Sequence, residues 1–480
     1  MVPDAYSVRA ASGLPAAASR APARRRSRTG SGARPVVGLL ASMPVLWLLG
    51  GERLVSPILV AGVTVAAALG RPAVRRGLPS ALGWAVVFLA AYLVSGFQVE
   101  GAGRVLTFLW DFSLYFASFC LMFSVYRYAR TPDDIRAILR AAVALMVFSH
   151  ALTTWHLLFG PIEFETLLGR LLPGEVRATA TGQMVAFHSV GRDLWFFGLG
   201  DRVSGIFGPS IHLGSAILLS IPIIYVLASE AKGVRRLSWT AFGVLSLVIL
   251  VYSQARTAMV IAAGTLPALL LSGRLARSRL VTMRLIVPIA AFAAIVFLAA
   301  GLSLAPAAEE AARGFFVDAR RSSADTRFEI YRQTAAAIVE NPVTGHGTQR
   351  DVSDLRYPLG SHSWYLAVLY KHGLLGFVPF LTFLVSVHAA GIRALRRYRG
   401  DPATRRLVVG IVVALLGHAA LVTTVEPIVS ALHLYMFAVL AGAAITIGRM
   451  RPIGAGTEAG TETCAGTRVA RGRAVVPGWP

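Results

Sequence analysis

The residues of this chain best suited to chemistry are one histidine and three arginines at the edges of apolar segments: His362, Arg202, Arg256 and Arg327. An imidazole has an ordinary pKa of about 6.5, so it can exchange a proton near neutral pH. An arginine is permanently charged, and its planar fork of N–H donors matches phosphate oxygens. Residues of these types can stabilise charge that develops on a phosphate and can accept the proton of an attacking hydroxyl.

Each of these residues also has a plainer interpretation. Arg202 precedes an apolar run, where an arginine commonly extends to lipid headgroups. Arg256 stands in a short turn between two apolar runs, where the charge is costly unless it faces a cavity or a partner. Arg327 could be a solvated residue at a helix end, paired with Asp325, and His362 could make ordinary hydrogen bonds at the headgroup level.

Glu426 and His346 are weaker candidates. Glu426 lies in the turn between the last two apolar segments and could act as a carboxylate base, although such a residue more often only forms the turn. His346 stands between two glycines, where a histidine more often has a structural role.

The motifs of nucleotide and metal enzymes do not occur. We find no P-loop, no dinucleotide fingerprint and no Asp-x-Asp pair outside the apolar segments, since Asp351 and Asp354 are too far apart. Cys120 lies in an apolar run and Cys464 in a polar tail, so neither a disulfide framework nor a metal set follows. We therefore expect no metal and no cofactor, which disfavours an enzyme that uses a nucleotide sugar and a bound metal.

The composition is that of a membrane protein. Hydrophobic residues make up 55% of the chain and charged residues 15%. The apolar residues form long runs whose lengths suit helices rather than barrel strands. The net charge of +23 could suggest a nucleic-acid partner. We expect no such partner, because the arginines cluster in short loops between apolar runs, as in the cytoplasmic loops of membrane proteins.

The apolar runs predict an all-α bundle of about twelve transmembrane spans. These runs occupy residues 36–50, 54–69, 80–97, 105–126, 137–159, 205–228, 238–254, 257–273, 285–303, 364–390, 407–424 and 428–448. If the N-terminus is cytoplasmic, the basic loops all fall inside and two long loops, about 160–204 and 304–363, fall outside. We therefore expect a multi-pass protein of the cell membrane with both termini in the cytoplasm.

Five parts follow from this arrangement. We predict a disordered basic cytoplasmic tail over 1–35, spans one to nine over 36–303, an extracytoplasmic helical loop over 304–363, spans ten to twelve over 364–448, and a disordered cytoplasmic tail over 449–480.

The stretch from Thr326 to Phe377 is the most distinctive in the chain. Its first part predicts an amphipathic helix that ends at Asn341-Pro342, followed by a tight turn centred on His346 between two glycines. The residues expected on the packed face of the helix are Phe328, Tyr331, Ala335 and Ile338. Lys371 and His372 interrupt the next apolar run, so 361–373 should form a separate helix at the interface, with the span starting near Gly373.

This stretch resembles the signature of the O-antigen ligase and polymerase superfamily of bacterial envelope proteins. That signature is an arginine that opens a helix, an Asn-Pro-x-x-Gly-x-Gly turn, and a histidine pair before a Tyr-Leu helix that ends in glycine. Here it reads Arg327, Asn341 to Gly347, His362-Ser363, Tyr365-Leu366 and Gly373. The resemblance implies a fold like that of the class C glycosyltransferases, with the signature on the extracytoplasmic side of the membrane.

The same resemblance implies a function. Members of the superfamily move a glycan from a polyprenyl-diphosphate carrier to a glycan, lipid or protein acceptor, without a metal. By this resemblance Arg202, Arg256 and Arg327 would bind the departing diphosphate. His362 would assist the acceptor or position the diphosphate.

Two other functions stay open at this point. A transporter or flippase of a lipid-linked anionic glycan would also have many spans and intramembrane arginines. The long outer loop precedes the tenth span instead of dividing two halves, and no similarity between the halves is evident, which argues against repeat-built transporters. A peptidoglycan polymerase of the shape, elongation and division type is a further alternative, which the turn and the His-Ser pair disfavour.

Overall fold

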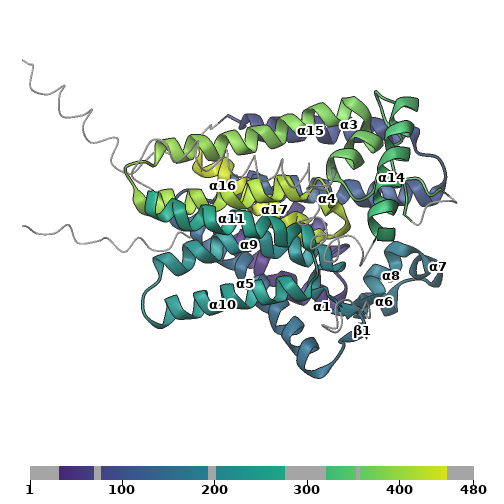
Figure 1. Cartoon of the computed structure of the whole chain (residues 1–480). Helices are drawn as coiled ribbons and strands as arrows, with labels where there is room; N and C mark the ends of the chain where they lie inside the picture. Colours follow the sequence, from purple (N-terminus) through teal and green to yellow (C-terminus); the bar gives the residue numbers. More distant parts are fainter. Residues whose placement is uncertain (1–31, 70–76, 193–201, 276–320, 353–356, 451–480) are drawn as a thin grey trace, which may run out of the picture.

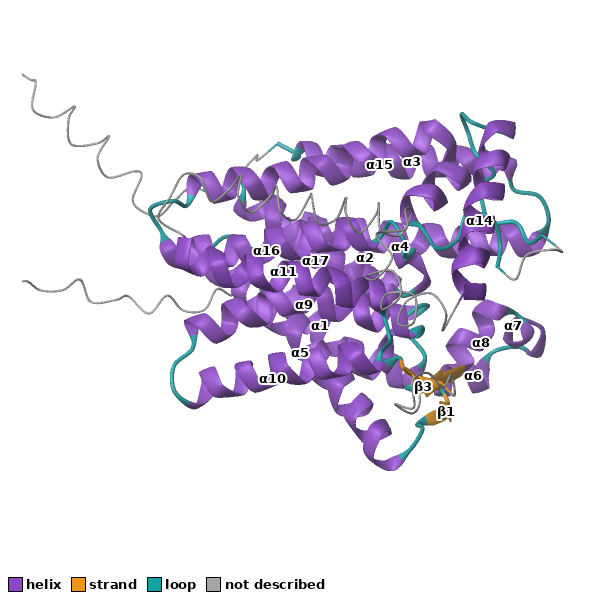
Figure 2. Cartoon of the chain, viewed as in Figure 1, coloured by secondary structure: helices purple, strands orange, loops and turns teal. Residues whose placement is uncertain are grey.

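The computed structural model describes residues 32–69, 77–192, 202–275, 321–352 and 357–450. Most of these residues form long helices that run side by side in a bundle, and short helices and strands gather at one end of it (Figures 1 and 2). The all-α prediction is confirmed, and the only β-structure in the described ranges is two small antiparallel sheets and one isolated bridge.

The long helices coincide with the predicted apolar runs. They are α1 (Arg34–Leu49), α2 (Val55–Leu69), α3 (Ser80–Ser95), α4 (Ala102–Tyr128), α5 (Pro132–Phe159), α9 (Ser210–Glu230), α10 (Val234–Tyr252), α11 (Arg256–Leu275), α15 (Trp364–Arg397), α16 (Pro402–Leu421) and α17 (Ala431–Ile447). The predicted span 285–303 lies outside the described residues. So do most of the tails 1–35 and 449–480 and the start of the predicted loop 304–363.

Seven helices of the described part are long and apolar enough to cross a membrane: α3 extended by the 3₁₀-helix η1 (Gly96–Gln98), α4, α5, α9, α10, α15 and α16. Three shorter apolar helices, α1, α2 and α17, accompany them. The protein is therefore a polytopic helical membrane protein, and the count of twelve spans stays a prediction.

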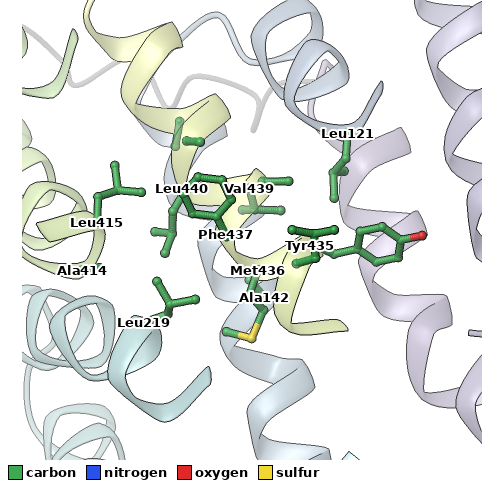
Figure 3. Packing of buried hydrophobic residues seen from close by; sticks show 14 of the residues in the cluster. Leu121, Ala142, Leu219, Ala414, Leu415, Tyr435, Met436, Phe437, Val439 and Leu440 are labelled. Carbon is green, nitrogen blue, oxygen red and sulfur yellow. The ribbon is translucent and has the colours of Figure 1, made fainter. Parts of the chain in front are cut away.

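Helix α17 lies at the centre of the bundle. All of its residues are buried, and it packs against α4, α15 and α16. Figure 3 shows Phe437 and Leu440 of α17 among Leu121, Leu219 and Leu415 from surrounding helices. A helix that is apolar on every side belongs inside a bundle. Helix α10, by contrast, exposes an apolar face that suits contact with lipid.

Short elements and the longer helix α14 close one end of the bundle. They are β1 (Glu163–Glu165), α6 (Leu167–Leu171), α7 (Gly174–Ala178), α8 (Ala180–Ala186), β2 (Phe187–Ser189), β3 (Gly191–Arg192), β4 (Arg202–Val203), the 3₁₀-helices η2 (Gly205–Phe207) and η5 (Pro427–Val429), and α14 (Arg321–Glu340). Strand β1 pairs with β2, and β3 with β4. We call the end that carries α14 and the start of α15 the signature end, and the other the opposite end (Figure 1).

Candidate active site

A broken helix underlies the signature end. Helix α15 is two helices joined at Gly373, whose φ of 58° and ψ of −164° are not helical. This confirms the prediction of a separate helix before Gly373. The break leaves backbone groups without their helical partners, and apolar surroundings make unpaired groups costly. Another segment must supply the missing hydrogen bonds.

The Asn-Pro-x-x-Gly-x-Gly turn is that segment. The N–H of His346 donates to the carbonyl of Tyr370 at 3.0 Å, and the N–H of Gly347 donates to that of Lys371 at 2.7 Å. In the other direction, Leu374 and Leu375 donate to the carbonyls of Pro342 and Val343, at 2.8 and 3.0 Å. The turn therefore pairs the groups on both sides of the break, which ties the loop after α14 to the helix that carries His362 at its start.

Helix α14 ends at Glu340, just before Asn341-Pro342, as predicted. The predicted packed face is wrong in part, because Phe328 is 72% exposed and Ala335 is exposed too, while Tyr331 and Ile338 are half-buried. The buried residues are Ile330, Thr334 and Ala337. Two polar contacts fix this rotation of the helix. Thr334 Oγ1 accepts from the N–H of Gly360 at 3.1 Å, and the Ala337 carbonyl lies 2.8 Å from His346 Nε2.

His362 stands one residue before the N-cap of α15, Ser363 lying between it and the helix, in a left-handed conformation with φ of 66°. Its neighbours fix it, since its carbonyl accepts from the Tyr331 hydroxyl at 3.3 Å and the edge of its ring meets Tyr357, 4.7 Å between centroids. Its Nε2 is buried without a hydrogen-bond partner in the described part of the chain. Left-handed backbone is uncommon outside glycine and is concentrated at functional sites.

The electrostatic surroundings keep His362 neutral. Burial lowers the pKa of His362, and the nearby positive charge of Arg327 lowers it further, to about 4. Arg327 also acts on the Tyr331 hydroxyl, although burial raises the pKa of Tyr331 overall. Arg327 therefore lies near enough to act on the charge of His362, and a neutral imidazole with an unpaired nitrogen is able to accept a proton.

Arg202 and Arg256 both lie at the turn between α10 and α11, which is at the signature end. Arg202 lies on β4, and its Nε donates to the Ser253 carbonyl at 3.0 Å, in the turn between α10 and α11. Gln254 holds this turn with φ of 53°, and Arg256 begins α11 immediately after it. Both arginines are half-buried.

This second turn is linked to the start of α15. The Thr424 hydroxyl lies 3.3 Å from the Thr257 hydroxyl. The backbone N–H of Trp364 donates to the Val422 carbonyl at 2.9 Å. The segment after α16 therefore contacts both the residue next to Arg256 and a residue two positions after His362. The segment 422–424 thus links the neighbours of Arg256 and His362 at the signature end.

Glu426 and His346 have protein partners. Glu426 is 4% exposed, and it accepts from Lys371 Nζ at 2.6 Å and from Gln349 Nε2 at 2.8 Å. Lys371 also lies 3.4 Å from Asp111 of α4. His346 is buried against Tyr370, and Arg104 donates to its carbonyl at 2.8 Å. These contacts favour a positioning role for both residues.

Sequence reasoning missed Asp111 and Arg104. Asp111 could have been recognised from the sequence, because an acidic residue inside an apolar helix is rare and normally has a partner. Nothing in the sequence distinguishes Arg104 from any other arginine at the start of a span. Among the described residues, no group of three His, Cys, Asp or Glu side chains could hold a metal ion.

Comparison with known families adds a further finding. The family model described as O-antigen ligase matches residues 241–381. This range begins within α10 and ends within α15, so it contains Arg256, Arg327, the signature turn and His362, while Arg202 and Glu426 fall outside it. No curated protein matches the chain.

Proposed function

We propose that this chain is a member of the O-antigen ligase and polymerase superfamily, as the match over residues 241–381 supports, and that it transfers a glycan from a polyprenyl-diphosphate carrier to an acceptor hydroxyl or amine. The observation that carries the proposal is the pair of Arg327 and His362, in which a buried imidazole nitrogen without a hydrogen-bond partner stands beside a permanent cation.

In the proposed reaction, His362 Nε2 accepts the proton of the acceptor as its oxygen or nitrogen bonds to the anomeric carbon. The bond from that carbon to the diphosphate oxygen breaks, and its electron pair leaves with the lipid diphosphate. Arg202, Arg256 and Arg327 stabilise the charge that develops there. The diphosphate is already part of the donor, so the chemistry requires neither a nucleotide nor a metal.

We place the active site on the extracytoplasmic side. Support comes from the loops and adjoining helix ends of the opposite end, which carry Arg127, Arg130, Arg136, Lys232, Arg235, Arg236, Arg393, Arg396, Arg397, Arg399, Arg405 and Arg406. Such loops face the cytoplasm in membrane proteins. In sealed cells an impermeant thiol reagent should label Arg332→Cys and leave Arg399→Cys unlabelled. The reverse pattern would contradict the placement.

Turnover of a defined donor tests the assignment of the site. Purified protein would be mixed with a polyprenyl-diphosphate glycan and candidate acceptors in the presence of a chelator, and the released lipid diphosphate measured. We expect His362→Ala and Arg256→Ala to lose turnover. Arg332→Ala is a matched control, because this exposed arginine pairs only with Glu329 among the described residues. Unchanged turnover in both site variants would remove the assignment.

A further inference from the structure

A second polar site lies at the opposite end of the bundle. A cavity of about 380 Å³ opens between the start of α3, the end of α15 and the end of α17. This volume falls within the range of small-ligand sites, roughly 300–1,000 Å³. The cavity shares no residue with the candidate active site, so a ligand bound there would be additional to the glycan donor.

Three arginines line this cavity, namely Arg393, Arg397 and Arg449, and none of its other described lining residues is acidic. Arg397 Nη1 donates to the carbonyls of Gly448 and Met450, at 2.6 and 3.1 Å. Arg449 Nη1 donates to the Gly77 carbonyl at 2.7 Å. A guanidinium has five N–H donors, so these contacts fix two of the cations at the rim and leave donors for a ligand.

Arg393 contributes a cation with no hydrogen-bond or ion-pair partner within the described ranges, and its side chain is exposed. Ser80 and Ala81 of the first turn of α3 also line the cavity, and no side chain caps that turn. Free N–H groups and the positive end of the helix dipole add to the attraction for an anion. The cavity thus suits a phosphate group.

The surroundings of the cavity favour the phosphate of a lipid over free phosphate as its ligand. Along its length α15 exposes apolar side chains such as Val378 and Val385, which suit contact with lipid chains. Arg393 follows Val385 by about two turns, or roughly 12 Å along the helix. An amphipathic ligand could therefore lie along α15 with its phosphate among the arginines, whereas free phosphate would leave the apolar approach unused.

We propose that this cavity binds the phosphate headgroup of an anionic phospholipid. Basic pockets between transmembrane helices are known to recognise such headgroups, and the anionic leaflet attracts positive charge placed near its surface. The bound lipid would hold the start of α3 against the ends of α15 and α17, where the described protein contacts include hydrogen bonds from Arg397 and Arg449.

Native mass spectrometry of the full chain in detergent tests this proposal. The protein would be titrated with phosphatidylglycerol, with phosphatidylcholine, or with inorganic phosphate. We expect preferential retention of phosphatidylglycerol. Arg393→Gln should weaken it roughly fivefold, the effect of one cation near an anionic surface. Arg449→Gln should weaken it as well, which repeats the test from the segment just after α17.

Arg396→Gln is the matched control, because Arg396 is an exposed arginine of the same helix that does not line the cavity. It should retain phosphatidylglycerol as the wild type does. Equal weakening by Arg393→Gln and Arg396→Gln would overturn the proposal in favour of diffuse surface attraction. Equal retention of the two lipids would also overturn it. Displacement of the lipid by an equal concentration of inorganic phosphate would assign the site to free phosphate instead.

Discussion

Gly345 of the signature turn lies so close to Gly373 of α15 that a Cβ atom on Gly345 would stand 2.5 Å from the Gly373 backbone nitrogen. Both residues have positive φ, 69° and 58°. A Cβ atom on Gly373 would in turn overlap the Val343 carbonyl. Gly345 and Gly373 therefore belong to one structural unit, in which a turn completes the hydrogen bonds of a broken helix.

The first prediction concerns this unit. Gly345→Ala should destabilise the fold by about 1–3 kcal/mol, because the added methyl has no space and the backbone cannot shift without breaking the hydrogen bonds to α15. A lower melting temperature in detergent would report this. Gly233→Ala is the control, since Gly233 also has positive φ but has open space around it. Equal losses in both variants would show that backbone strain alone is responsible.

The second prediction is a pH profile. The pKa of His362 is lowered to about 4. If neutral His362 is the base, turnover should stay level as the pH falls from 7 to about 5 and should drop only as the pH approaches 4. A base with the ordinary pKa of about 6.5 would lose half its activity near that pH. His362→Gln should lower turnover roughly 10²–10⁴-fold, the usual contribution of a positioned base.

The third prediction tests the coupling of Arg327 to His362. Removing a positive neighbour raises the pKa of an imidazole. The fall of turnover at low pH, the acid limb of the pH profile, should therefore begin at a higher pH in Arg327→Gln than in the wild type, in addition to any loss of rate. The shift should be partial, because burial is the larger cause of the lowered pKa.

Arg332→Gln controls for charge on the same helix and should leave the acid limb in place. An acid limb that does not move in Arg327→Gln would separate Arg327 from the site.

The fourth prediction distinguishes positioning from catalysis at Glu426. Glu426→Ala leaves Lys371 with only the more distant Asp111, and breaking a buried pair typically costs about 3–5 kcal/mol, so the melting temperature should fall clearly. Glu329→Ala, at a half-buried residue outside this pair, should leave it unchanged.

A Glu426→Gln variant with normal stability and no turnover would instead identify Glu426 as the base. Normal stability together with wild-type turnover in Glu426→Ala would contradict both roles.

The fifth prediction concerns the shape of the cation at Arg256. Arg256→Gln should lower turnover roughly 10²–10³-fold, as removal of one stabilising donor does elsewhere. Arg256→Lys should restore only part of it, because a lysine keeps the charge but lacks the planar fork that binds two phosphate oxygens. Arg332→Lys provides the control. Full activity in Arg256→Lys would mean that charge alone is needed there.

Much of the fold was predictable because a helix that crosses a lipid bilayer must be a long apolar run of sequence. Each predicted apolar run in the described ranges is a helix, and the break at Gly373 was visible from Lys371 and His372 in an apolar run. The face of α14 was not predictable, because Thr334 packs inward through a hydrogen bond with Gly360 that no hydrophobic pattern reveals. Polar contacts of this kind can set which face of a helix is buried, against the periodicity of its apolar residues.

The candidate site was predictable only as residue types at the edges of spans. The sequence contains His362 and Arg327, but their proximity depends on the rotation of α14 and on the contact between Tyr331 and the His362 carbonyl. The ion pairs of Lys371 were hidden as well, because Asp111 and Glu426 come from α4 and from the segment after α16. Contacts between distant segments are set by packing, which local patterns do not encode.

The most direct test of the central claim is a single reaction in which two products are counted, in a chelating buffer and with the protein in sealed vesicles. We predict that each glycan joined to an acceptor is matched by one polyprenyl diphosphate released, and that His362→Gln forms neither product. Donor that crosses the bilayer with its glycan still attached, and with no diphosphate released, would show that the protein moves this lipid rather than reacts with it.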